Sequence, residues 1–438
     1  MPLRDRVKAA VQKTKALPAK AKSLPAKAKA LPAKARAAVT AHKRRHAPSG
    51  FEFALADRVG QLRPDHWDAL VAGHGVCFSR AYLEALEAAG PEGMKGHYAL
   101  IYRGAKPVAA VACQSLFIDG AALPARTEPT RAKAVRDKGL AKLRQRILVC
   151  GNLLGWGPQG VAFAAEEDPG DLWPAVAEAL YRIRRADKLF GETDLVMIKD
   201  LSPLEGEADE ALHPFSYRPF ETEPNMVLDL RPEWNSFDAY LAAMKSDYRS
   251  GIKKQIKDVE AAGITVERLD LEGLRQHAPA IDALYHAVHD RQKMRLMTIH
   301  PQWIPTLAER FGADFRTTIL RAPDHGKVLG FITTLKDGEG AIGYYVGFDK
   351  EVAATGLPLY LRLLYALVED AIDLKAAWVS LGRTALEPKA KLGAKPQPLR
   401  CLLRHRIPAL NQVVKALLQV LPEPAQAPKR TPFKPAKS

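Results

Sequence analysis

Two adjacent phenols, Tyr344 and Tyr345, lie among small residues in a run that is expected to be a β-strand. Because side chains alternate between the two faces of a strand, Tyr345 would share its face with Ala341, Gly343 and Gly347, while Tyr344 would lie on the other face. Small neighbours leave room for a ligand, so we predict Tyr345 to be a ligand-facing acid or hydrogen-bond donor and Tyr344 to be part of the core. Two packed sheet tyrosines are the alternative.

Polar residues between this strand and the next helix are further candidates. Asp349 ends the strand, where the sites of layered α/β folds gather, and is predicted to be catalytic, although a plain turn aspartate gives the same pattern. Thr355 and Gly356 precede Pro358 at an expected helix start, whose backbone N–H groups could bind a phosphate or a carboxylate. We group Thr355, Gly356 and Tyr360 as candidate substrate-binding residues; a bare helix cap is the alternative.

A loop expected after the last core strand carries four charged residues, Arg383, Glu387, Lys389 and Lys391. Arg383 and Lys389 could bind an anionic group of a substrate, and Glu387 could act as a base. Solvated charges on a loop are the alternative.

A helix expected over residues 236–262 carries a basic residue at every fourth position: Lys245, Arg249, Lys253 and Lys257. Like charges at this spacing repel one another, so the stripe is either fully solvated or binds a polyanion. Gly251 is the expected break in this helix.

Histidines and cysteines form no pattern typical of a metal site. His286 and His289 share a helix face with Asp290 but have no third ligand nearby in the sequence, which favours a surface pair. The cysteines are scattered without a CxxC pair, which favours reduced thiols and argues against zinc. They are Cys77, Cys113, Cys150 and Cys401.

The net charge of +16 is concentrated at the two ends of the chain. Residues 1–46 hold fourteen Lys or Arg against the single acid Asp5, and residues 423–438 add a charge of +3. The body between them is formally neutral, so an anionic partner of the tails, such as a membrane surface or nucleic acid, need not be the substrate. A proline in each copy of the seven-residue repeat LPAKAKA predicts disorder or short kinked helices in the first tail. Without an apolar segment typical of export or membrane spanning, we expect a cytoplasmic protein, with peripheral binding to the inner membrane as an extension of that hypothesis.

The body alternates apolar strands with amphipathic helices, which predicts a mixed α/β fold. The expected strands are 51–56, 97–102, 107–117, 194–198, 225–230, 315–320, 328–336, 341–348 and 377–381. The expected helices are 63–71, 80–89, 130–146, 171–188, 236–262, 279–293, 302–311, 357–374 and 409–420. We predict a basic tail at 1–50, globular domains at 51–222 and 223–408, and an amphipathic helix with a second basic tail at 409–438.

Several segments resemble FemAB-like proteins, a group of the GNAT superfamily that includes BioF2-like acetyltransferase domains. The basic helix at 238–257 is similar to the helix that opens the C-terminal domain of these proteins, and the segments 343–349 and 380–393 are similar too. The resemblance covers residues 225–410 well and the first half of the chain more loosely.

The resemblance implies tandem GNAT-like domains of the α/β class, with mixed, mostly antiparallel sheets flanked by helices. It also implies transfer of an acyl or aminoacyl group to an amine, without a metal or a bound cofactor. The donor would be an acyl-CoA or acyl-carrier-protein thioester, or an aminoacyl-tRNA. Residues 350–359 depart from the Gln/Arg-x-x-Gly-x-Gly/Ala loop with which ordinary GNAT domains bind the coenzyme A pyrophosphate.

Three functions therefore stay open. The first is N-acylation of an amine, such as an amino-lipid or a sphingoid base, at the inner membrane surface, with the basic tails on anionic lipid. The second is aminoacyl-tRNA-dependent transfer in peptidoglycan precursor synthesis, with Lys245, Arg249, Lys253 and Lys257 on the tRNA phosphates. The third is a nucleic-acid-associated protein without catalysis. The sequence leaves the oligomeric state open.

Overall fold

The computed structural model describes residues 47–119, 144–202, 206–290, 297–323, 326–418 and 424–435. The expected conformation of the N-terminal tail and most of the helix expected at 130–146 lie outside these residues. Residues 144–146 are described, and they begin a strand rather than end a helix.

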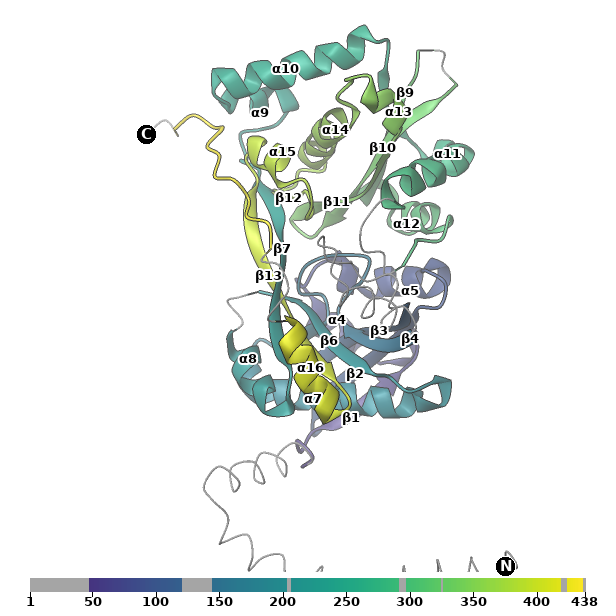
Figure 1. Cartoon of the computed structure of the whole chain (residues 1–438), viewed down its shortest axis with the longest axis vertical. Coiled ribbons are helices and arrows are strands. Elements are labelled where there is room, and N and C mark those ends of the chain that lie inside the picture. Colours follow the sequence, from purple (N-terminus) through teal and green to yellow (C-terminus); the bar gives the residue numbers. More distant parts are fainter. Residues whose placement is uncertain are drawn as a thin grey trace, which may run out of the picture. The chain divides into compact units, whose positions relative to one another are not determined.

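One mixed sheet runs through the body (Figure 1), with 13 strands in the part of the chain that the structure describes. The strands lie in the order β1-β2-β3-β4-β6-β13-β7-β12-β11-β10-β9-β8, and β5 pairs with β3. The pairs β4–β6 and β11–β12 are parallel and the other pairs are antiparallel, which confirms the predicted α/β class with a mostly antiparallel sheet. The strands are β1 (Glu52–Ala56), β2 (Lys95–Arg103), β3 (Lys106–Asp119), β4 (Arg144–Cys150), β5 (Val161–Phe163), β6 (Leu195–Leu201), β7 (Arg218–Asp229), β8 (Thr265–Leu269), β9 (Phe315–Arg321), β10 (Val328–Asp337), β11 (Gly340–Phe348), β12 (Trp378–Ser380) and β13 (Lys395–His405).

Helices pack on the sheet through three large apolar cores. One core gathers around α7 and α8, and a second lies between α4 and α5 of the first half and α11 and α12 of the second half. A third gathers around α14 and includes buried side chains of α9 and α10. The helices are α4 (Pro64–Val71), α5 (Arg80–Ala89), α7 (Pro169–Ala186), α8 (Gly206–Leu212), α9 (Phe237–Ala243), α10 (Ser246–Ala261), α11 (Leu271–His289), α12 (Trp303–Phe311), α13 (Lys350–Ala354), α14 (Leu359–Asp373), α15 (Leu386–Lys391) and α16 (Pro408–Leu418).

The strand β13 connects the two halves of the sheet. The sequence pattern did not predict it, because residues 395–405 contain two prolines and lack a regular alternation of apolar and polar residues. It lies between β6 and β7, and β7 itself crosses the predicted boundary at 222–223. The limits of the two predicted domains stay a prediction, and "first half" and "second half" below mean residues 51–222 and 223–408.

The long helix expected at 236–262 is two helices, α9 and α10, and the expected break at Gly251 is wrong. Gly251 lies inside α10, and the break falls at Met244 and Lys245. The cause is a contact from far along the chain: Met244 forms a β-bridge with Phe433, and Lys245 N donates a hydrogen bond to Pro432 O at 2.8 Å. No local pattern could have located this break.

Candidate active site

The parallel strands β11 and β12 are paired over two positions, Ala341 with Val379 and Ile342 with Ser380. β12 ends at Ser380, the last of these positions, and β11 continues from Gly343 to its end without a described strand on that side. A cavity of about 570 Å³ lies beside this stretch of β11.

The cavity is lined mainly by apolar and aromatic side chains from both halves of the chain. The second half contributes α11, β11, α14 and the loop after β12, and the first half contributes the loop Leu153–Trp156. Among the described residues, this lining contains one arginine, Arg383, one lysine, Lys389, and no Asp or Glu. Such a lining suits a ligand with a long apolar part and a polar or anionic end.

A β-bulge shapes the wall of the cavity on β11. The register of β10 and β11 shifts between Ile332 and Thr334, so Tyr344 and Tyr345 together oppose the single residue Thr333. Tyr345 N donates a hydrogen bond of 2.8 Å to Thr333 Oγ1, which replaces the ladder bond lost at the bulge.

The bulge puts both tyrosines on the face of the sheet that packs against α11 and α12. Tyr344 and Tyr345 both belong to that core, whereas a Cβ atom on Gly343 would meet Leu367 of α14 on the opposite face. The prediction that Tyr344 and Tyr345 occupy opposite faces is therefore wrong, because strict alternation fails where one strand has an extra residue.

The ring of Tyr345 lines the cavity, but its hydroxyl is buried and has no hydrogen-bond partner among the described residues. The ring packs edge-on against Tyr285, with 5.8 Å between the centroids. Burial, and after it the neighbouring Tyr285, raises the pKa of the Tyr345 phenol, so the group stays protonated and is not available as a base. The role of Tyr345 as an acid stays a prediction.

Tyr344 is part of a hydrogen-bond network that joins the two halves. Its hydroxyl is hydrogen-bonded to that of Tyr82 in α5, and Asn152 Nδ2 donates to the Tyr82 hydroxyl at 2.9 Å. Gln114 Nε2 of β3 donates in turn to Asn152 Oδ1 at 3.3 Å. These groups are buried, so the network fixes the first-half loop at Asn152 relative to β11.

Arg383 is held at the cavity by a fully buried carboxylate of the first half. Asp200, which is 0% exposed, forms ion pairs with Arg383 and with Lys199, and it accepts a hydrogen bond from Gly157 N at 3.2 Å. The Nε of Arg383 is buried without a hydrogen-bond partner in the described part of the chain. Asp200 therefore orients Arg383, whose side chain lines the cavity.

Lys389 lines the same cavity from α15, a short helix where the sequence predicted a loop. The side chain is 3% exposed, and its Nζ donates a hydrogen bond to Arg383 O at 2.9 Å. Burial lowers the pKa of Lys389 to about 7, against a small opposing effect of Glu223. A large share of Lys389 is thus neutral near pH 7, and a neutral amine can accept a proton.

Four of the predicted site residues meet at this cavity: Tyr345, Tyr360, Arg383 and Lys389. Asp349 does not line it. Its Oδ1 accepts hydrogen bonds from the backbone at the start of α13, and its Oδ2 lies 2.7 Å from Lys327 Nζ.

The other predicted residues also lie outside the cavity. Glu387 faces solvent and pairs with Arg430 at 2.7 Å. Thr355 and Gly356 are exposed after the end of α13. On and before α10, Lys253 is exposed, while Lys245 Nζ donates to Thr431 Oγ1 at 3.2 Å and Arg249 Nη1 to Met244 O at 3.4 Å. The roles predicted for all these residues stay predictions.

The sequence reasoning missed two parts of the cavity wall. His289, expected as one of a surface pair, lines the cavity and stacks on Tyr285 with 4.7 Å between ring centroids. The i, i+4 spacing of these two aromatic rings was the available signal. The other part is the loop Leu153–Trp156 of the first half.

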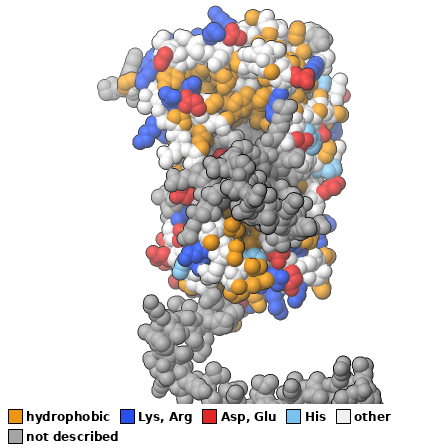
Figure 2. Space-filling model, viewed as in Figure 1, with side chains coloured by type: hydrophobic (Ala, Val, Ile, Leu, Met, Phe, Trp, Pro, Cys, Tyr) orange, Lys and Arg blue, Asp and Glu red, His pale blue; other side chains and the backbone are white. Residues whose placement is uncertain are grey.

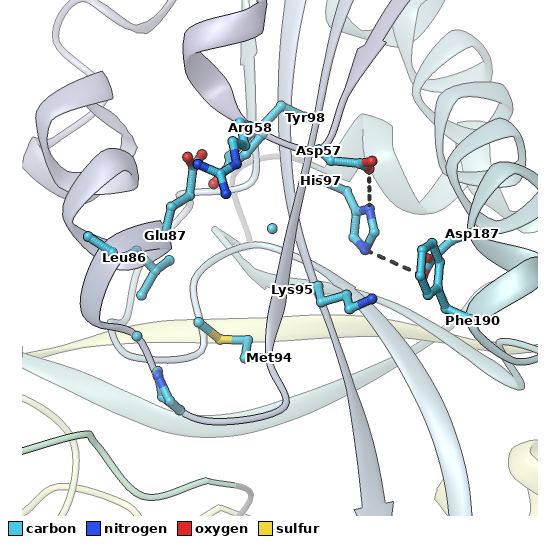
Figure 3. A pocket seen from close by; sticks show the side chains of 14 residues that line it. Asp57, Arg58, Leu86, Glu87, Met94, Lys95, His97, Tyr98, Asp187 and Phe190 are labelled. Carbon is cyan, nitrogen blue, oxygen red and sulfur yellow. Dashed lines mark ion pairs between the residues drawn. The ribbon is translucent and has the colours of Figure 1, made fainter.

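A second cavity, of about 370 Å³, lies in the first half (Figure 3). The imidazole of His97 has Asp57 and Asp187 on its two sides, each at 3.5 Å, and Ser115 Oγ lies 2.8 Å from its Nε2. Burial lowers the pKa of His97, although Asp187 and Asp57 act in the opposite direction. Asp187 also forms an ion pair with Arg146. The charged groups buried here, His97, Asp187 and Arg146, pair with one another, so we assign this cavity no chemistry.

Within the described ranges, no group of three or more His, Cys, Asp or Glu side chains is arranged to hold a metal ion. None of the helices in these ranges has both the length and the apolar character needed to cross a bilayer.

Comparison with protein families identifies the part of the chain that contains the cavity. Residues 246–390 match the model of the acetyltransferase (GNAT) domain family. This range includes β11, β12 and α14, together with Arg383 and Lys389. The chain thus contains a GNAT acetyltransferase domain, and the predicted membership of the GNAT superfamily is confirmed.

Solved structures share this fold at low sequence identity. FemX has 12% identity and a TM-score of 0.50, over 83% of this chain and 99% of the FemX chain. A tandem GNAT protein from the clavulanic acid biosynthesis pathway has 12% identity and a TM-score of 0.48, over 82% of this chain and 99% of that one. L-PGS from Bacillus licheniformis has 10% identity and a TM-score of 0.43, over 77% and 94%. No curated protein matches the sequence. The predicted GNAT-like fold is confirmed, and at these identities the likeness concerns the fold alone.

Proposed function

We propose that this protein transfers an acyl group from a thioester donor to an amine acceptor in the cavity beside β11. The observation that carries the proposal is the end of β12 at Ser380 while β11 continues to Phe348, which leaves a strand edge beside a mainly apolar cavity lined also by Arg383 and Lys389. Amide groups of an extended donor can hydrogen-bond to such an edge as an added strand does. The apolar wall would contact the acyl chain.

The transfer needs a proton acceptor and donors for the carbonyl oxygen. The C–N bond forms as the C–S bond breaks, the attacking amine loses a proton, and the leaving thiolate gains one. Neutral Lys389 can accept the proton of the amine. The guanidinium of Arg383 and backbone N–H groups of β11 beyond Gly343 can donate to the developing oxyanion.

The apolar lining favours a long acyl chain as the transferred group and an amino-lipid or sphingoid base as the acceptor. The donor would be an acyl-CoA or an acyl-carrier-protein thioester. Its phosphate groups would lie near the start of α14, which has no side-chain cap and whose residues Tyr360 and Leu364 line the cavity. The protein would act at the inner surface of the cytoplasmic membrane, with the cationic tail at residues 1–46 attracted to anionic lipid.

Aminoacyl transfer from tRNA is the second candidate, because α10 presents Lys253 and Lys257 to solvent on one face. These side chains could meet RNA phosphates. A nucleic-acid-associated role without catalysis, carried by the cationic tail, is the third.

Thiol release by the purified chain tests the proposal. We would offer acetyl-CoA, long-chain acyl-CoA and acyl-carrier-protein donors, each with and without a sphingoid base, and identify the product by mass spectrometry. Thiol release that requires both a long-chain donor and the amine is the expected result. A product formed only from aminoacyl-tRNA and a peptidoglycan precursor would favour the second candidate. No transfer with any donor, together with DNA binding that is lost on deletion of residues 1–46, would favour the third.

A further inference from the structure

Exposed large hydrophobic side chains gather on two neighbouring elements near the end of the first half. Leu189 is 95% exposed and Phe190 is 61% exposed, both in the 3-10 helix η5 (Asp187–Phe190). On α16, Leu410, Val413 and Leu417 are exposed at 42%, 52% and 46%, at a spacing that puts them on one face of the helix. We call these five residues the apolar surface.

Ion pairs bring the two elements together. Arg406, directly before α16, lies 2.5 Å from Glu192 Oε2 and 3.0 Å from Asp194 Oδ1. Glu192 follows η5 by two residues and also pairs with Lys188 at 3.0 Å. The start of α16 therefore lies beside the chain that leaves η5.

The protruding end of η5 is fixed from within the protein. Asp187, at the start of η5, is buried and forms ion pairs with Arg146 and His97. At the other end, Lys95 Nζ lies 3.6 Å from the centroid of the Phe190 ring (Figure 3). Leu189 and Phe190 are thus presented to solvent on an anchored turn.

The border of the apolar surface is basic. Lys188 lies within η5 and Lys95 lies against Phe190, Arg406 lies between the two elements, and α16 carries Lys415 and no acidic residue. Glu192 and Asp194 pair with Lys188 and Arg406, so Lys95 and Lys415 are the basic side chains of this border that no acid of the same border answers. Figure 2 shows hydrophobic side chains gathered on the lower part of the visible face, where α16 lies in Figure 1, with Lys and Arg at their edge.

We propose that the apolar surface docks on an anionic lipid bilayer, with Leu189 and Phe190 inserted among the acyl chains and α16 lying in the interface. A leucine that protrudes almost completely suits a fluid surface that can surround it, and the basic border suits anionic headgroups. The covalently attached tail at residues 1–46, with its charge of +13, would add a long-range attraction to the same partner. The apolar contacts and the tail are separate contributions, because only the former require particular residues of the folded body.

Vesicle co-sedimentation of the full chain tests this docking without any turnover, so its outcome is separate from that of the proposed chemistry. We would compare mixed phosphatidylglycerol and phosphatidylcholine vesicles with pure phosphatidylcholine vesicles. The variants are Leu189→Asp and Val413→Asp, and the matched control is Leu55→Asp, at an exposed leucine of β1 outside the apolar surface. Thermal unfolding checks that all three variants fold.

We expect the wild type to bind the anionic vesicles, and each of the two surface variants to lose at least about tenfold in partition coefficient, with Leu55→Asp unchanged. Binding of both surface variants at the wild-type level would overturn the proposal. This holds also if deletion of residues 1–46 abolishes binding, because the tail alone would then bind the vesicles. So would a wild type that ignores vesicles and instead forms a dimer that Val413→Asp dissociates.

Discussion

Trp156 Nε1 donates a hydrogen bond of 2.8 Å to Ser380 Oγ, and this bond joins a loop of the first half to the last paired residue of β12. Ser380 in turn donates to Asn225 Oδ1 at 2.7 Å, so the bond to Trp156 is anchored in β7 as well. The cavity begins at the point where β12 ends, directly beside this contact. One wall of the cavity therefore depends on a partner more than 200 residues away in the sequence.

A double-mutant cycle measures this contact. Trp156→Phe removes the donor but keeps an aromatic ring, and Ser380→Ala removes the acceptor. We expect a coupling free energy of about 1 kcal/mol in the free energy of unfolding, as for a single partly buried hydrogen bond. Additive effects of the two substitutions in urea unfolding would show that the bond does not hold the loop.

Asp200→Asn tests the buried carboxylate that orients Arg383. Asparagine can still accept the hydrogen bond from Gly157 N, but it leaves Arg383 and Lys199 without their anion. We expect a loss of about 3 kcal/mol in the free energy of unfolding. The matched control is Asp229→Asn, which breaks a surface pair with Lys395 and should cost less than about 1 kcal/mol. Equal losses in the two variants would contradict the assigned role of Asp200.

The lowered pKa of Lys389 predicts how activity depends on pH. The neutral amine is the proton-accepting form, and with a pKa of about 7 it is lost as the pH falls through 7. We expect acyl transfer to rise with pH along a limb centred near pH 7 and then to level off. Lys389→Met should lower turnover by about 10² to 10⁴-fold and remove this limb. An unchanged limb in the variant would assign the titration to another group.

Tyr345→Phe tests the phenol that the sequence singled out. A hydroxyl that donates its proton during the reaction would predict a loss of about 10² to 10⁴-fold in turnover. Because this hydroxyl is buried beside Trp303 and has no hydrogen-bond partner in the described residues, we expect less than about tenfold, with no loss in melting temperature. A larger loss of turnover in a normally folded variant would restore Tyr345 as the acid.

Val288→Trp tests the chain length of the donor. Val288 lines the cavity from α11, whereas its neighbour Ala287 does not, so Ala287→Trp is the matched control. We expect Val288→Trp to lower kcat/KM for a long-chain donor at least about tenfold and to change that for an acetyl donor much less. Equal effects on both donors would place the acyl chain elsewhere.

Periodicity alone located most of the helices and strands, because each element has one face that must be buried. The helix expected at 80–89 and the strand expected at 341–348, for example, differ from α5 and β11 by at most one residue at either end. The sequence also indicated the loop at Arg383 and Lys389 and the superfamily to which the chain is similar.

The tertiary structure alone decided which of these residues meet. The bulge at Tyr344 and Tyr345 depends on Thr333 of the neighbouring strand, so the alternation rule could not foresee it. The strand β13 could not be predicted from its own residues, because it is stabilised by pairing with β6 and β7 rather than by a local sequence pattern. The lowered pKa of Lys389 and the pairing of Asp200 with Arg383 arise from burial between segments distant in sequence, and burial is a property of the packed chain rather than of any segment within it.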